Sequence, residues 1–142
     1  MLTTASSISL RPFCRGQRGQ IVALLALLLA VLGGMTAVAV DLGSFAADRR
    51  DLQNAADAIA LAASQDLPNS STAQAAATQW AINNDIDLAD MTVTIIPQSL
   101  PNEPNPKVRV VLQRDHSFTF ARLIGITSAT VRASAAAIKT SP

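Results

Sequence analysis

The pattern of apolar positions along the chain begins with a long uninterrupted run. Ile21–Val40 holds 20 residues and no charged side chain. As a helix this run would be about 30 Å long, which matches the thickness of the hydrocarbon core of a bilayer. Thr36 carries the one side-chain hydroxyl of the run, and it can donate to a carbonyl group one turn earlier. The run therefore predicts a membrane-spanning helix.

Small residues recur within this run at spacings of three and four. Such spacing places them on one face of a helix, where a second helix can approach closely. The same spacing also arises by chance, because alanine and glycine are common in membrane helices. The predicted helix-packing face consists of Ala26, Ala30, Gly33, Gly34 and Ala37.

An amphipathic pattern follows the run and predicts that the helix continues beyond the membrane. Apolar residues fall on a three-four repeat and form a seam, whose members are Leu42, Phe45, Leu52, Ala56, Ile59 and Ala63. The other side of the helix carries Asp41, Ser44, Asp48, Asp51 and Ser64. Pro68 and Asn69 end the pattern, so one helix is expected over Gln20–Asp66. Ala56 and Ala63 give the seam little side-chain bulk at two positions, so whatever packs there must come close.

A second helix and a small sheet are predicted after this helix. Ser71 to Gln74 fit a capping box with Ser71 as the N-cap, and Trp80 is expected to anchor the core. Period-two alternation then predicts three strands, which are Met91–Ile95, Lys107–Gln113 and Thr127–Ile138. Phe118–Ile124, before the third strand, is expected to form one or two helical turns. The fold class is therefore α+β, with a small antiparallel sheet of about three strands.

The charge distribution predicts the orientation in the membrane. Arg11, Arg15 and Arg18 precede the apolar run, and no lysine or arginine follows it until Arg49. By the positive-inside rule, we expect the N-terminus to lie in the cytoplasm and residues 41–142 to lie outside the cytoplasmic membrane. The predicted organisation is a basic cytoplasmic N-terminus over 1–20, a single transmembrane helix over 21–40, an amphipathic helix over 41–66 and a small α+β head over 67–142.

Proteolytic release of the head is the alternative to this organisation. Ala37-Val38-Ala39 has the small-x-small form that signal peptidase accepts, so cleavage before Val40 is conceivable. The apolar run is longer than the usual core of a signal peptide, which favours a retained anchor. Under the alternative, the chain is a secreted binding module that is released near Ala39.

Residues that could carry chemistry are few, and no enzyme is predicted. His116 is the single histidine and is expected in a surface loop, while Cys14 is the single cysteine and is expected to be unmodified in the cytoplasm. No glycine-rich phosphate loop, metal-ligand spacing or nucleophile elbow is present in the sequence. Residues 41–142 hold eight basic and ten acidic side chains, which disfavours nucleic-acid binding. We expect no cofactor and no metal, and we expect the aspartates after the apolar run to form a solvated face.

Residues 15–64 resemble the N-terminal region of Tad (tight adherence, Flp pilus) assembly proteins of the TadE/TadG type. The resemblance rests on Arg18-Gly19-Gln20 before the run, Val40-Asp41-Leu42-Gly43 after it, Arg49-Arg50, and the segment LQNAADA over Leu52–Ala58. Phe118–Ile126 (FTFARLIGI) and the strand after it are similar to the short pilin-like head of the same group. The family-motif residues are Asp41, Gly43, Gln53, Asn54 and Asp57.

The resemblance implies a pilin-like plan and a structural role in the bacterial cell envelope. Related pseudopilins carry a glutamate five residues after a prepilin-peptidase site, whereas Ile21 and Leu24 stand five residues after Gly16 and Gly19. The chain is therefore expected to keep its N-terminus, as a short form without a von Willebrand A domain. The expected function is a non-enzymatic, membrane-anchored component of a Tad/Flp-type pilus or adhesion-secretion apparatus. Its expected partners are other membrane proteins of that apparatus, or a second copy of the same chain.

Overall fold

A computed structural model describes residues 17–96 and 105–139 and divides the chain into two units, 1–36 and 37–142. The described part of the first unit belongs to helix α1, which extends over Gln17–Gln65. α1 is long and apolar enough to cross a membrane, and the side chains of its apolar window are exposed. Thr36 Oγ1 donates to the carbonyl of Leu32 at 2.9 Å, as predicted. Cys14, Arg11 and Arg15 lie outside the described residues.

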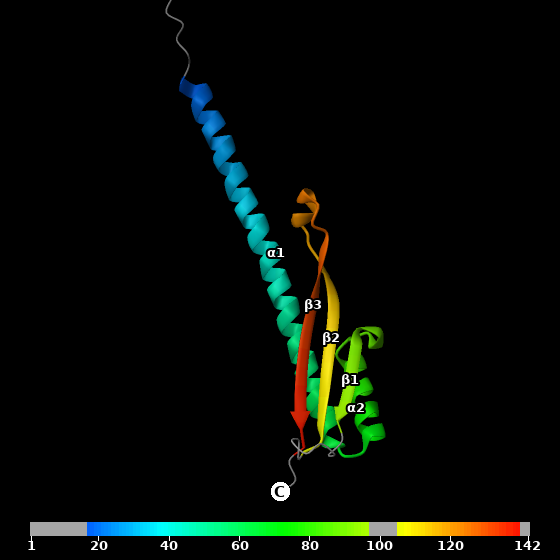
Figure 1. The fold of residues 1–142 in the computed structure, drawn as a ribbon. Coiled ribbons are helices and arrows are strands. Elements are labelled where there is room, and N and C mark those ends of the chain that lie inside the picture. The colour runs from blue at the N-terminus through cyan, green and yellow to red at the C-terminus, as the bar shows by residue number, and fades with distance from the viewer. Residues whose placement is uncertain (1–16, 97–104, 140–142) are drawn as a thin grey trace, which may run out of the picture. The chain divides into compact units, whose positions relative to one another are not determined.

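The second unit is an α+β head, which confirms the predicted fold class (Figure 1). Its elements after α1 are α2 (Ser70–Asn83), η1 (Leu88–Asp90), β1 (Met91–Ile96), β2 (Lys107–Ser117), η2 (Ala121–Ile124) and β3 (Ser128–Ile138). The strands form one antiparallel sheet in the order β1-β2-β3. In the long β2–β3 hairpin, Lys107 pairs with Ile138 at one end and Ser117 with Ser128 at the other. Phe118–Thr127 connects the two strands at the second end.

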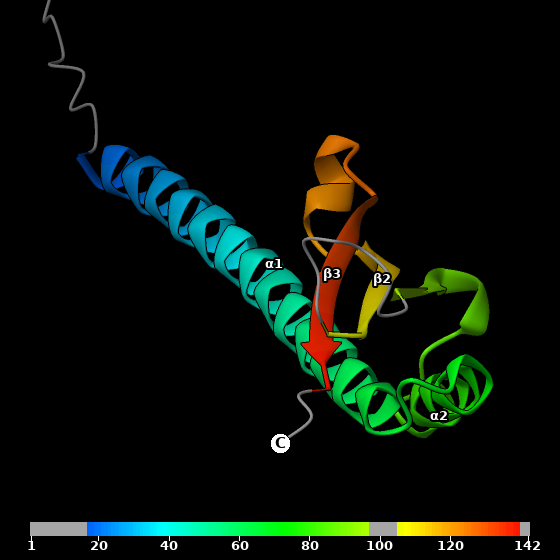
Figure 2. The ribbon, with the colours of Figure 1, turned by 60° about the horizontal axis from the view of Figure 1, so that its bottom comes forward.

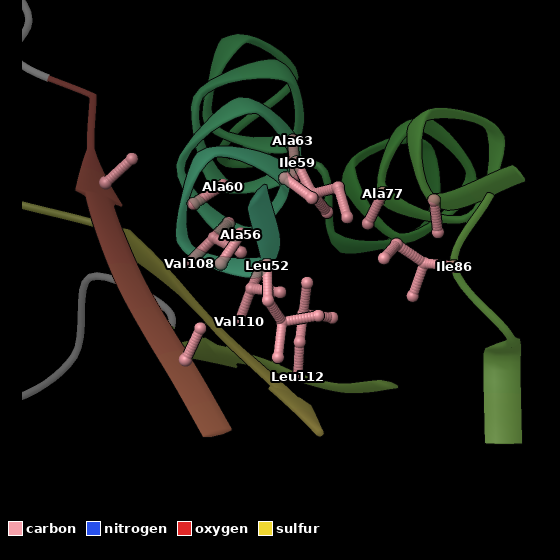
Figure 3. Close-up of a cluster of buried hydrophobic side chains, with 14 of the residues drawn as sticks. Leu52, Ala56, Ile59, Ala60, Ala63, Ala77, Ile86, Val108, Val110 and Leu112 are labelled. Carbon is pink, nitrogen blue, oxygen red and sulfur yellow. The ribbon is translucent and has the colours of Figure 1, made fainter. Parts of the chain in front are cut away.

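The core lies where one face of the sheet meets the C-terminal part of α1. Period-two alternation buries Val108, Val110 and Leu112 of β2 completely, and Leu52 of α1 lies against them (Figure 3). α2 lies beside the end of α1 and completes this layer (Figure 2). Core residues further along the chain include Ala73, Ala77, Ala81, Ile86, Val131, Ala133 and Ala137. Burial of these apolar faces, rather than any covalent link, holds the head together.

The seam of α1 is covered by the chain itself. Leu52, Ala56, Ile59 and Ala63 are at most 1 % exposed, and Phe45 packs against their cluster. Leu42, the first member of the predicted seam, is 61 % exposed and does not belong to the core. The buried part of the seam is therefore not available to a partner.

Alanines line the contact between α1 and α2. Ala73, Ala77 and Ala81, one turn apart on α2, are fully buried. Ala77 points toward Ile59 and Ala63 of α1 (Figure 3). Such small side chains allow the two helix axes to approach closely, which leaves no room for an indole between them. The prediction that Trp80 anchors the core is wrong for this reason, since Trp80 lies at the flank of that face and is 45 % exposed.

The ends of the helices are capped by side chains. Asn69, not the predicted Ser71, is the N-cap of α2, and its side chain accepts hydrogen bonds from the backbone N–H groups of Ser71 and Thr72. At the other side of this turn, Lys139 Nζ donates to the carbonyls of Gln65 and Leu67 at 2.7 Å each. A cation at these carbonyls complements the negative end of the α1 dipole. The segment after β3 is thereby tied to the end of α1.

Candidate functional site at Asp41

The carboxylate of Asp41 binds the loop that connects β2 to β3. Its oxygens accept hydrogen bonds from three consecutive backbone N–H groups, those of Thr119 at 2.9 Å, Phe120 at 3.0 and 3.2 Å, and Ala121 at 2.6 Å. Asp41 is only 5 % exposed, so the prediction that it belongs to a solvated acidic face is wrong. The reason is that the N–H groups come from residues 78 to 80 positions later in the chain. We call this arrangement the Asp41 clasp.

The turn of the loop points the N–H groups of Thr119, Phe120 and Ala121 toward the Asp41 carboxylate. Phe118 N donates to the carbonyl of Thr127, which continues the hairpin by one bond, and the chain then turns through η2. Gly125 closes the turn with a φ of 89°, which favours glycine, and Ile126 N donates to the carbonyl of Ala121. The first N–H groups of such a turn have no partners within it, so a carboxylate is a suitable acceptor for them.

The pKa of Asp41 follows from two opposing effects. Burial raises the pKa, since it removes water from the charged form, but the hydrogen bonds from the backbone of Ala121, Thr119 and Phe120 lower it. The net result is a pKa below the ordinary value of 3.8. Asp41 is therefore an anion at neutral pH, and its charge is balanced by backbone dipoles.

His116 continues the polar contacts from the clasp to α1. Its Nδ1 lies 2.6 Å from Asp48 Oδ2, and its Nε2 lies 3.4 Å from Ser44 Oγ. Ser44 Oγ in turn donates to the backbone carbonyl of Asp41 at 2.9 Å. His116 is only 7 % exposed, so the prediction of a surface-loop histidine is wrong. It lies inside because β2 extends to Ser117, four residues further than expected, and residue 116 falls on the inward-facing side of the strand.

Two phenylalanines enclose the imidazole ring. Phe45 and Phe118 pack edge-on to His116 with ring centroids 5.6 and 5.1 Å away, and they stack on one another at 5.9 Å. Phe45 comes from α1, whereas Phe118 comes from the start of the loop. The three rings therefore join α1 and the hairpin by a second, largely apolar contact beside the clasp.

The loop that the clasp holds exposes apolar side chains. Leu123 is 86 % exposed and Ile124 is 78 % exposed, and Ile126 and Phe120 are exposed as well. A single exposed leucine needs no explanation, but several on one short loop are typical of an interaction surface. We call these four residues the apolar tip.

The other family-motif residues serve different purposes. Gln53 Nε2 donates to Asp57 Oδ1 at 3.1 Å and to the carbonyl of Ser134 on β3 at 3.2 Å, so it ties the helix to the strand. Asn54 is exposed beside a hollow that Ile86 and Arg114 also line. Gly43 is helical, and a side chain added to it would meet nothing within 4 Å in this chain. Sequence reasoning selected Asp41 as a motif residue but missed His116, Phe118 and the loop amides.

The contacts at this site hold the loop against α1. Among the described residues, no group of three histidine, cysteine or acidic side chains could hold a metal ion. His116 Nε2 lies 3.4 Å from Ser44 Oγ, but the hydroxyl hydrogen of Ser44 is already donated to the backbone carbonyl of Asp41. What the arrangement does is fix the position of the loop relative to α1 just after its apolar run.

The fold and the site define a class of protein: a small α+β head on one long N-terminal helix, whose first part is apolar enough to cross a membrane. Residues 19–78 match the model of the Tad family, described as putative Flp pilus-assembly TadE/G-like. The resemblance predicted from the sequence is thereby confirmed over most of α1 and α2, whereas the sheet lies outside the matched range. Comparisons with curated proteins and with solved structures gave no match.

Proposed function

We propose that this protein is a non-enzymatic assembly component of a Tad/Flp-type pilus apparatus, anchored in the cytoplasmic membrane by α1. The observation that carries the proposal is the family match over residues 19–78, which includes the whole apolar run, the buried seam and the Asp41 motif. The three arginines before the run support an N-terminus inside and a head outside. Under this proposal, α1 contacts other components of the apparatus within the bilayer, and the outer surface of the head contacts them outside it.

The face of α1 that would meet a partner in the bilayer is the small-residue strip. Ala26, Ala30, Gly33 and Gly34 are exposed in the isolated chain. The corresponding contact beyond the membrane is not offered by the buried seam residues Leu52, Ala56, Ile59 and Ala63, because the chain itself covers them. Contact with another membrane helix is therefore proposed for the strip alone.

Replacing Gly34 with leucine tests this contact. A Cβ atom added at Gly34 meets nothing within 4 Å in the chain itself, so we expect Gly34→Leu to leave the protein's own fold intact. It adds bulk where a close helix–helix contact needs a small residue, and we expect recovery of crosslinked partner membrane proteins to fall several-fold. The matched control is Leu28→Phe, which adds bulk to the opposite face of the helix at a nearby depth. Equal recovery of crosslinked partners from the two variants and the wild type would contradict the proposed contact through the small-residue strip.

A second candidate function is a binding module released from the membrane. The observation that favours it is a hollow of about 680 Å³ on the head, lined by side chains that include Arg49, Arg109 and Arg132. Cleavage before Val40 would leave Asp41 and the rest of the clasp in the released part. The hollow suits an anionic ligand, since all of these charged side chains are cationic.

The mass of the mature protein separates the two candidate functions. For the anchored component we expect an intact mass that includes residues 1–40, recovered from the membrane fraction. Substituting Ala39→Leu blocks the small-x-small site and should change that mass only by the difference between the two side chains. A mature chain that begins at Val40, and that the same substitution prevents from forming, would instead establish the released module.

A further inference from the structure

In the head unit, apolar side chains are exposed both on the apolar tip and on the adjacent part of α1. Val38, Val40 and Leu42 of α1 are each about half exposed or more, as are Leu123, Ile124 and Ile126 of the loop. Figure 1 shows that the loop between β2 and β3 lies at one end of the hairpin. This end is the one beside the beginning of the head unit's part of α1. Exposed apolar side chains on two separate segments point to a common apolar environment.

The Asp41 clasp fixes the position of the apolar tip along α1, relative to the end of the apolar run. Asp41 directly follows the last residue of the apolar run, and the run is as long as the hydrocarbon core is thick. The backbone of residues 119–121 is hydrogen-bonded to its carboxylate at 2.6 to 3.2 Å. The loop therefore lies at the level where α1 leaves the hydrocarbon, within the headgroup layer, which is roughly 5–8 Å deep on each side of a bilayer.

The charge of the loop suits lipid as its neighbour. Between Ser117 and Thr127 the sequence holds no acidic residue, and its one charged side chain is Arg122, which is exposed. An arginine can keep its guanidinium among lipid phosphates while its stem lies on the apolar layer. The clasp removes the cost of placing a carboxylate there, because three N–H groups satisfy it.

We propose that the apolar tip inserts into the outer headgroup–acyl boundary of the membrane that α1 spans, with the lipid surface as its partner. The proposal rests on the membrane anchoring in the proposed function and adds a second point of attachment. With α1 and the tip both held in the membrane, the head and the helix that it packs on turn and tilt less relative to the bilayer and present one fixed side to the apparatus. The occupant is lipid rather than another protein, since the exposed part of α1 at the same level is itself continuous with the apolar run.

Fluorescence of a labelled loop tests the insertion in the full chain. Cys14→Ser removes the native thiol, and Leu123→Cys then accepts an environment-sensitive nitrobenzoxadiazole label on a side chain that is 86 % exposed. The matched control is Ile138→Cys, which is also exposed and apolar but lies at the other end of the hairpin, about 33 Å along β3 from Ser128, where the loop ends. Both proteins are reconstituted at low density into vesicles of phosphatidylethanolamine and phosphatidylglycerol, and flotation with the vesicles is measured separately.

For insertion we expect a blue-shifted label at 123 that nitroxide-bearing acyl chains quench and aqueous iodide quenches several-fold less than the label at 138. Equal iodide quenching at both positions overturns the proposal while leaving the anchored component intact. A blue shift without nitroxide quenching also overturns it, because the loop is then buried against protein, such as a second copy. Failure of the chain to float overturns the membrane anchoring itself, and the insertion with it.

Discussion

Leu52→Ala is expected to destabilise the head by about 2–5 kcal/mol, the usual cost of emptying a buried leucine site. Leu52 is 1 % exposed and lies where α1 meets β2, against Val110 and Leu112 (Figure 3). Small domains are stable by only about 5–15 kcal/mol in total, so this loss is a large share. The backbone cannot collapse into the space, because the same helix is held by α2 on another side.

Urea unfolding of the full chain in detergent, followed by fluorescence, measures this loss. Trp80 is the one tryptophan of the chain and lies on α2, so its emission reports the head. The control is Leu61→Ala on the same helix, where Leu61 is 58 % exposed, and it is expected to change the unfolding free energy by less than about 0.5 kcal/mol. Similar midpoints for the two variants would contradict the core described for α1.

Asp41→Asn is expected to release the loop from α1 without unfolding the core. Asparagine keeps one acceptor oxygen but turns an NH₂ donor toward N–H groups that have no other acceptor. The amides of Thr119, Phe120 and Ala121 should then lose most of their protection from hydrogen exchange, while the amides of the β2–β3 pairs keep theirs. Asp51→Asn makes the same charge change at an exposed position of the same helix and should alter none of these rates. Unchanged protection at residues 119–121 in Asp41→Asn would contradict the clasp.

The clasp also predicts how stability depends on pH. The folded state lowers the pKa of Asp41 below 3.8, so the stability that the carboxylate contributes is fully present above that value. It is lost as the pH falls through the lowered pKa, because the folded state then has to bind a proton that it disfavours. The difference in melting temperature between the wild type and Asp41→Asn should therefore be constant near neutrality and narrow below pH 3.8. A melting-temperature difference between the two proteins that grows as the pH falls would contradict a lowered pKa of Asp41.

The elements of the fold were largely predictable because each has a local pattern. The apolar run and the three-four repeat predict α1 to within a few residues of its observed ends at Gln17 and Gln65. Alternation predicts β1, β2 and β3, although β2 continues to Ser117 through polar residues that the pattern treats as a loop. Long periodic segments are set by their own sequence, whereas the ends of elements depend on pairing with distant strands.

The site depends on contacts that sequence spacing does not show. The clasp joins residues 78 to 80 positions apart, and the contact from His116 to Asp48 joins residues 68 positions apart. Motif resemblance selected Asp41, but its partners are backbone N–H groups, which every residue except proline has. The sequence indicated helical turns over Phe118–Ile124, but it does not reveal which acceptor the N–H groups of the loop find. The division of the chain at residues 40 and 66 stays a prediction.

The central proposal, an anchored assembly component, is tested most directly by crosslinking in native membranes. A photoreactive amino acid at Gly34, on the small-residue strip, is compared with one at Leu28 on the opposite face, and covalent products are identified by mass spectrometry. We expect adducts from Gly34 to membrane proteins of the pilus apparatus or to a second copy of the chain, with few from Leu28. Recovery of the chain free of membranes, or the same bulk envelope proteins from both positions, would contradict it.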